Sequence, residues 1–204
     1  MLRTFTIGES TLVLLKRLQQ VPMLHDLRLV GGTALALQLG HRNSVDLDLF
    51  GVIDKTQDQI SDELKAKGFD VNHPERESKM IKLLVVNGVK VDIVGGHREW
   101  LNPPIEIEGV RMASLQDIAA MKLHAITGRG RKKDFIDLYF LLQHFSLEQI
   151  VEFYVKKYPQ NSLFIVIRSL SYFKDAESDP MPDMFIDVGW EEMKSTIRNA
   201  IENF

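Results

Sequence analysis

Apolar and polar residues alternate with a period of two in several short segments of the first half of the chain, a pattern typical of strands that bury one face. We predict strands over residues 27–30, 44–50, 80–87 and 89–94. The last two are joined by Asn87-Gly88, the dipeptide that best indicates a two-residue hairpin turn. Helical spacing between the strands predicts helices over about residues 10–18, 33–40 and 54–67. This half is therefore expected to form a small mixed sheet with helices.

Beyond about residue 112 the period-two pattern disappears, and every long segment has helical spacing. Ser114-Leu-Gln-Asp117 is a capping box that predicts the start of a helix. The Pro-rich stretch 179–183 predicts a loop before a last helix that starts at Trp190. The predicted fold class is α+β, with a mixed β-sheet and helices in a domain of residues 1–110 and a helical bundle in a domain of residues 111–204.

Composition narrows the classes of protein that fit the chain. Its 204 residues carry 25 Lys and Arg against 28 Asp and Glu, so no global basic excess draws it to nucleic acid. The lack of cysteine excludes disulfides, thiolate metal sites and cysteine nucleophiles, and agrees with a reducing compartment. Charges interrupt the apolar runs of the first twenty residues, and no window approaches the roughly 18 apolar residues that a spanning helix needs. We expect a cytoplasmic protein rather than a membrane protein.

Three aspartates in strand-like segments are the candidate metal ligands. Asp46 and Asp48 are two apart on a predicted strand, so their side chains share a face and their Cα atoms lie about 7 Å apart. Asp92 has apolar neighbours on a second strand, where an unpaired carboxylate would be costly. Such hard oxygen ligands suit magnesium, with manganese as the alternative. Taken singly, a solvated strand face explains Asp46 and Asp48, and a strand edge facing water explains Asp92.

Gly31-Gly32-Thr33 separates a predicted strand from a predicted helix. Glycine lets the backbone approach a ligand closely, and the positive N-terminus of a helix offers N–H groups to phosphate oxygens. An ordinary strand-to-helix turn with Thr33 as N-cap is the alternative. Followed by a strand with two acids, the turn gives the arrangement that nucleotidyl transfer needs, because one element binds the phosphates of a nucleoside triphosphate and the other holds metal.

The segments Gly31-Gly-Thr-Ala-Leu-Ala-Leu and Gly40-His-Arg-Asn-Ser-Val-Asp-Leu-Asp-Leu-Phe resemble the nucleotidyltransferase AbiEii/AbiGii toxin family. The resemblance covers roughly residues 25–145 and implies a minimal nucleotidyltransferase core with an appended helical bundle. Many members are toxin halves of bacterial toxin–antitoxin or abortive-infection pairs, which implies a cognate antitoxin as a partner.

The same resemblance assigns roles to individual residues. Gly32 and Thr33 match the first motif, although the broader superfamily more often has serine at the second position. Asp46 and Asp48 match the metal-binding pair, and Asp92 matches the third acid. The third-motif lysine and the later basic and acidic positions correspond to Lys122, Arg129, Lys132, Lys133, Asp134 and Asp137.

Read from the residues alone, the second half leaves several alternatives open. Lys122 lies in a mostly apolar helix and needs a partner, which a triphosphate or a structural acid would supply. The basic run 129–133 suits triphosphate or an RNA backbone, or else is a solvated loop. Asp137 is expected to orient Lys122 or Arg129, whereas Asp134 is equally explained by dipole compensation at a helix N-terminus.

We predict a magnesium-dependent nucleotidyltransferase that transfers a nucleoside monophosphate to tRNA or to a protein hydroxyl, the acceptors that the resemblance suggests. Asp92 would also assist deprotonation of the acceptor. Arg42 and Ser44 would bind phosphate or fix the loop before the acids. The residues assigned to nucleotide binding are Gly31, Gly32, Thr33, Arg42, Ser44, Lys122, Arg129, Lys133 and Asp137. The alternative is a catalytically silent protein of the same fold that binds nucleotide or a partner.

Overall fold

The computed structural model of the chain describes residues 1–74, 78, 80–96 and 99–204. The chain divides into two compact units: unit 1 comprises Met1–Gln38, Ser44–Glu99 and Pro104–Ala113, and unit 2 comprises Leu39–Asn43, Trp100–Pro103 and Ser114–Phe204. The sequence predicted one boundary near residue 110. The two units instead alternate along the chain, because the short segments 39–43 and 100–103 belong to unit 2.

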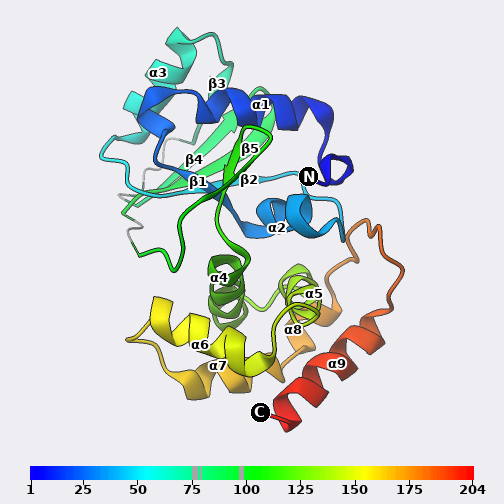
Figure 1. The fold of residues 1–204 in the computed structure, drawn as a ribbon. Helices are drawn as coiled ribbons and strands as arrows, with labels where there is room; N and C mark the ends of the chain where they lie inside the picture. The colour runs from blue at the N-terminus through cyan, green and yellow to red at the C-terminus, as the bar shows by residue number, and fades with distance from the viewer. Residues whose placement is uncertain (75–77, 79, 97–98) are drawn as a thin grey trace. The chain divides into compact units, whose positions relative to one another are not determined.

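Unit 1 contains a mixed sheet whose described strands follow the order β3-β4-β5-β2-β1-β7-β6 (Figure 1). The strands are β1 (Arg28–Val30), β2 (Leu47–Phe50), β3 (Val71–Asn72), β4 (Ile81–Val86), β5 (Val89–Val94), β6 (Ile105–Ile107) and β7 (Val110–Met112). The pairs β2/β5 and β1/β7 are parallel, and the others are antiparallel. Strands β2 and β5 each have a neighbour on both sides, so their backbone is held firmly in place.

The helices of unit 1 are α1 (Glu9–Gln19), α2 (Gly31–Leu39, whose last residue is assigned to unit 2) and α3 (Gln57–Ala66), with 3-10 turns at Thr4–Thr6 and Pro22–Leu24. Helix α2 is apolar on nearly all sides, and its residues from Gly32 to Leu37 are buried. An all-apolar helix of this kind belongs in a core. The start of α2, next to the end of β1, is therefore fixed by packing.

Several predictions for unit 1 can be compared with the structure. The hairpin is confirmed: Asn87 (φ 49°) and Gly88 (φ 79°) connect β4 to β5 with the two positive φ angles of a type I′ turn. The helix predicted to start at Thr33 starts at Gly31, so the alternative in which Thr33 is its N-cap is wrong. Strands β3, β6 and β7, of two or three residues each, were not predicted.

Unit 2 is helical, as predicted. Its helices are α4 (Leu115–Gly128), α5 (Lys132–Leu141), α6 (Leu147–Lys157), α7 (Leu163–Leu170), α8 (Lys174–Glu177) and α9 (Trp190–Glu202). Helix α4 is contacted by α5, α6 and α7, and α9 packs on α5 and α7 (Figure 1). Half of the predicted capping box is formed: Ser114 caps α4 by accepting a hydrogen bond from the backbone N–H of Asp117, whereas the Asp117 carboxylate accepts from the backbone N–H of Leu101. Helix α9 starts at Trp190, as predicted. Within the described residues, no helix has the length and apolar character needed to cross a membrane.

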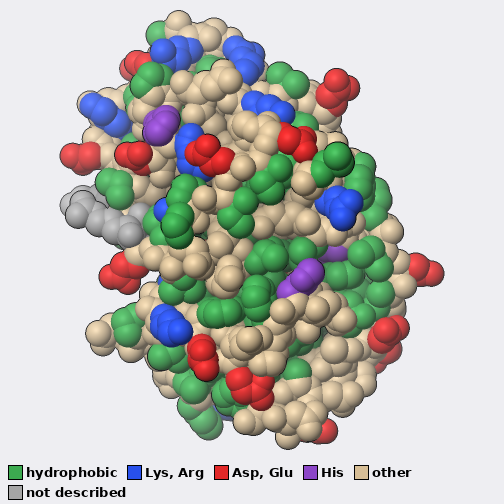
Figure 2. Space-filling view, in the orientation of Figure 1, with side chains coloured by type: hydrophobic (Ala, Val, Ile, Leu, Met, Phe, Trp, Pro, Cys, Tyr) green, Lys and Arg blue, Asp and Glu red, His purple; other side chains and the backbone are tan. Residues whose placement is uncertain are grey.

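The surface agrees with the slightly negative net charge. On the described surface of the face in Figure 2, acidic and basic side chains are interspersed, and Lys and Arg do not gather into one basic patch. Candidate functional residues are therefore sought in local clusters of charge, and two of these, one in each unit, contain the residues that the sequence singled out.

Candidate active site

The first cluster lies on the face of β2 and β5 that carries Asp46, Asp48, Lys90 and Asp92, which we call the acid face. Asp48 and Asp92 stand directly opposite each other in the parallel ladder, on strands about 4.8 Å apart. Alternation sends Leu47 and its odd-numbered neighbours into the core and leaves the aspartates half-buried on the other face. Asp46 lies just before β2 and not inside it, because the strand that was predicted to begin at residue 44 begins three residues later, at Leu47.

The carboxylate of Asp48 lies against the first residue of α2. A Cβ atom at Gly31 would collide with Oδ2 of Asp48, and Gly31 also has φ +70°, a conformation that disfavours any side chain. Sequence reasoning assigned this glycine to phosphate binding. In the structure its first effect is to let an acid approach the positive end of a helix, where negative charge is stabilised.

Thr33 and Ser44 fix the loop that leads to the acids. The Thr33 hydroxyl donates to the backbone carbonyl of Asp46, and its oxygen is 2.8 Å from Oγ of Ser44. The Thr33 side chain is buried, so its hydroxyl acts on the loop. For Ser44, of the two roles left open by the sequence, this geometry matches the fixing of the loop.

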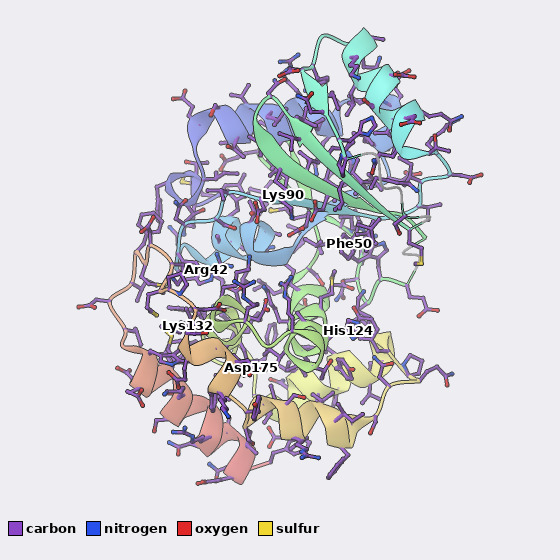
Figure 3. The ribbon with its side chains drawn as sticks, turned by 180° about the vertical axis from the view of Figure 1, so that it is seen from behind. Arg42, Phe50, Lys90, His124, Lys132 and Asp175 are labelled. Atoms are coloured by element: carbon purple, nitrogen blue, oxygen red, sulfur yellow. The ribbon has the colours of Figure 1, made fainter. Side chains whose placement is uncertain are left out.

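Lys90 is the cation of the acid face (Figure 3). Its Nζ donates to Oδ2 of Asp92 at 2.6 Å, and its side chain is about half-exposed, at 53%. Burial would lower the pKa of Lys90, but the hydrogen bond and charge of Asp92, together with the charges of Asp46 and Asp48, raise it above its ordinary value. All three carboxylates therefore act on this one ammonium.

The donor set of the acid face fits a divalent cation. Carboxylate oxygens are the ligands of magnesium and manganese, and Oδ1 of Asp92 is buried without a hydrogen-bond partner among the described residues. The side chains do not yet converge: within the described residues, no three His, Cys, Asp or Glu side chains are grouped as metal ligands. Lys90 holds the other oxygen of Asp92.

The second cluster, in unit 2, is centred on Asp137 of α5, which is fully buried. Its carboxylate accepts hydrogen bonds from Nε and Nη2 of Arg42 (2.7 and 2.9 Å) and lies 2.8 Å from Nε2 of His41 and 2.5 Å from Nζ of Lys122. Burial would raise the pKa of Asp137, but the charges of Arg42 and Lys122 and the hydrogen bond to His41 hold it well below its usual range. Asp137 is ionised and saturated with partners.

Asp134, one helical turn earlier, extends this buried ion cluster of His41, Arg42, Lys122, Arg129, Asp134 and Asp137. It accepts from Lys122 at 3.1 Å and from Nε and Nη2 of Arg129 at 2.9 and 3.0 Å. Burial would lower the pKa of Lys122, but the charges of Asp137 and Asp134 raise it. Lys122 therefore has the structural acids that were one of its two expected partners, and its role toward phosphate stays a prediction.

The basic run 129–133 divides into residues that hold a loop and residues that remain partly exposed. Arg131 and Lys132 hold the loop after α8, through Asp179 and the backbone carbonyl of Glu177. Lys133 is half-buried in the first turn of α5, and the Arg129 side chain stays 56% exposed although it is paired with Asp134. Arg42, by contrast, is buried.

Sequence reasoning missed two members of these clusters. Lys90 could have been found, because it precedes Asp92 by two residues on one strand and so shares its face. His41 gave no such signal, since its partner Asp137 is 96 residues away in the chain.

Comparison with known proteins places nearly the whole chain in a family. Residues 13–203 match the family model described as nucleotidyl transferase AbiEii toxin, type IV TA system. An uncharacterized protein of Aquifex aeolicus (strain VF5) is 30% identical over 194 residues, covering 93% of both chains.

Two solved structures share the fold. The nucleotidyltransferase toxin MenT4 of Mycobacterium tuberculosis H37Rv has a TM-score of 0.59 at 16% identity, over 94% of this chain and 84% of that one. JHP933 from Helicobacter pylori has a TM-score of 0.58 at 19% identity, over 97% and 94%. The match of residues 13–203 to the family model shows that this chain belongs to the nucleotidyl transferase AbiEii toxin family.

Proposed function

We propose that the protein is a metal-dependent nucleotidyltransferase that moves a nucleoside monophosphate from a nucleoside triphosphate to a hydroxyl of tRNA or of a protein, and that it is the toxin of a toxin–antitoxin pair. The observation that carries the proposal is the acid face, where Asp48 and Asp92 stand opposite each other beside the N-terminus of α2. Membership of a nucleotidyltransferase toxin family supports the reaction type.

The residues of unit 1 would divide the chemistry between them. Asp46, Asp48 and Asp92 would hold magnesium or manganese, which when bound neutralises phosphate charge and activates the attacking oxygen. The first turn of α2, at Gly31 and Gly32, offers backbone N–H groups and the positive helix end to the triphosphate. The Asp48 carboxylate lies against this same turn, so a metal held by Asp48 and phosphates bound at the turn would be neighbours.

Group transfer follows from this division. The acceptor hydroxyl oxygen attacks the α-phosphorus and forms the new P–O bond, while the bond from the α-phosphorus to the oxygen bridging to the β-phosphate breaks and pyrophosphate leaves. Asp92 would accept the hydroxyl proton, because its Oδ1 has no hydrogen-bond donor among the described residues. Lys122, Arg129 and Lys133 of unit 2 are proposed to contact phosphates, and the exposed guanidinium of Arg129 is the readiest of the three.

Pyrophosphate release tests the proposal directly. The protein is incubated with each labelled nucleoside triphosphate and magnesium, in one arm with total tRNA and in another with a cell protein extract. Asp46→Asn is expected to lower release at least about 100-fold, because a ligand of the metal loses its charge. Asp54→Asn, which changes an exposed acid outside the acid face, is the matched control and should leave the rate unchanged. Label in the tRNA arm or in the protein arm identifies the acceptor.

A silent protein of the same fold is the rival function, and the lack of a converged three-ligand group among the described residues favours it. Binding of nucleotide by calorimetry without release of pyrophosphate in either arm would decide for this rival. For the toxin role, induced expression should stop growth in the wild type but not in Asp46→Asn. Co-expression of a small reading frame adjacent to the gene should restore growth if it encodes the antitoxin.

A further inference from the structure

Lys90 occupies the place on the acid face where several negative charges meet. Along β5 it precedes Asp92 by two residues, so both side chains stand on one face. On the neighbouring strand, Asp48 stands opposite Asp92, and Asp46 lies just before that strand; the charges of both act on Lys90. The ammonium thus has an acid along its own strand and two more at the neighbouring strand.

The opposite neighbour of Lys90 offers no competing partner. Strand β4 faces Lys90 with Val85 and faces Asp92 with Leu83, and both side chains are apolar and exposed. Lys82 of the same strand lies on the other face, since β4 alternates between the two faces, and its Nζ donates to the carbonyl of Ser78. Because the facing side chains of β4 are apolar, the Lys90 ammonium is directed to the carboxylates, and it contacts Asp92.

The ion pair between Lys90 and Asp92 uses only one of the two carboxylate oxygens of Asp92. The ammonium reaches only Oδ2 of Asp92, whereas Oδ1 is buried and has no hydrogen-bond partner among the described residues. A buried carboxylate oxygen without a partner is costly. A divalent cation would supply the missing contact.

We propose that Lys90 is the internal counter-cation of the acid face and competes with the divalent metal for Asp92. Its ammonium holds Oδ2 in the metal-free protein and leaves it when metal binds, so metal affinity is lower than the three carboxylates alone would give. The long side chain reaches solvent on one side, and this allows the ammonium to swing away without any movement of the sheet. The inference rests on the metal site of the proposed function and adds to it the residue that regulates metal occupancy.

Metal titration of the full chain, without nucleotide, tests the competition. Binding of Mn²⁺, read from the loss of the free-ion EPR signal, and of Mg²⁺, read by calorimetry, is compared between the wild type and Lys90→Met. We expect Lys90→Met to bind both ions about 1.4- to fivefold more tightly, the range that follows from removing a partly exposed ion pair. Lys90→Arg retains the charge and should stay close to the wild type.

Lys67→Met is the matched control. Lys67 is also a half-exposed lysine of unit 1 that is paired with one carboxylate, Glu63, but it lies outside the acid face. Its substitution should not alter metal affinity. If Lys90→Met fails to fold, Lys90→Gln retains a polar end and gives the same comparison.

The outcomes separate this inference from the function on which it rests. Equal or weaker metal binding by Lys90→Met, with binding by the wild type intact, overturns the competition and leaves the metal site standing. A loss of nucleotide affinity at unchanged metal affinity also overturns it and makes Lys90 a phosphate contact. Absence of metal binding in every variant overturns the competition together with the metal dependence of the proposed function. Binding by Lys90→Met alone would support the competition in its strongest form.

Discussion

The acid face and the buried ion cluster contain the same residue types but differ in how completely their carboxylates are paired. In the buried ion cluster, Asp134 and Asp137 face Arg42, Lys122 and Arg129, so positive charge exceeds negative charge and each carboxylate has several donors. On the acid face, Asp46, Asp48 and Asp92 share Lys90, and one buried oxygen has no hydrogen-bond partner among the described residues. A saturated cluster stabilises a fold, whereas an unsaturated one is prepared for a ligand.

The largest effect expected from this comparison is the loss of stability in Asp137→Asn. Removal of the negative charge leaves Arg42 and Lys122 buried without an adequate counter-ion, which costs about 3–5 kcal/mol of unfolding free energy. Urea unfolding monitored by circular dichroism measures it. Asp179→Asn is the control: its ion pair with Arg131 is partly exposed and contributes about 0–1 kcal/mol, and the amide oxygen of asparagine can still accept from the backbone N–H of Lys132. A loss below 1 kcal/mol in Asp137→Asn would mean that the cluster is not structural.

The next largest effect concerns the contact between α2 and Asp48. Gly31→Ala places a Cβ against the Asp48 carboxylate at a residue with φ +70°, and we expect it to destabilise the protein by about 2–4 kcal/mol and to weaken metal binding. Gly68→Ala separates the two causes. Gly68 has a similar φ of +81° but no heavy atom within 4 Å of the added Cβ, so only the backbone cost of about 1–2 kcal/mol applies. Equal losses of unfolding free energy in Gly31→Ala and Gly68→Ala would show that the close approach of Asp48 to Gly31 has no effect on stability.

A smaller effect is the dependence of stability on pH that the buried ion cluster imposes. The pKa of Asp137 is held well below its usual range and that of Asp134 is also lowered, so their stabilisation is present above the unfolded carboxyl pKa of about 4 and is lost as pH falls toward the folded values. The pKa of Lys122 is raised, so its contribution is present below about pH 10 and is lost at higher pH. The urea concentration at the midpoint of unfolding should change little from about pH 5 to 9, and it should decrease below about pH 5. Asp137→Asn should show a shallower acid slope, and an unchanged slope would contradict the assignment.

These clusters also mark where the sequence was informative. Period-two alternation found β2, β4 and β5, and with them the shared face of Asp46 and Asp48, because side-chain direction on a strand is a local property. The order of the strands, with β5 beside β2, depends on chain topology, which no local pattern contains.

The partners of the cations were beyond the reach of local patterns. Arg42 meets Asp137 across 95 residues and Lys122 meets Asp134 across 12, so only the packed structure brings them together. The start of α2 at Gly31 was missed for a different reason. A Gly-Gly pair usually interrupts helices, and here the packing of an acid against the first residue makes glycine necessary.

The smallest expected effect is that of Asp92→Asn, which makes on the acid face the same Asp-to-Asn substitution that Asp137→Asn makes in the buried ion cluster. Asp92→Asn removes the pair with Lys90, which is half-exposed, and at the same time relieves the repulsion among the three carboxylates. The two changes oppose each other, so the unfolding free energy should change by no more than about 1 kcal/mol while metal affinity falls. Urea unfolding beside a Mn²⁺ titration measures both quantities on one sample. A stability loss as large as that of Asp137→Asn would show that Asp92 is a structural acid, and the acid face would then lose its claim to be prepared for a ligand.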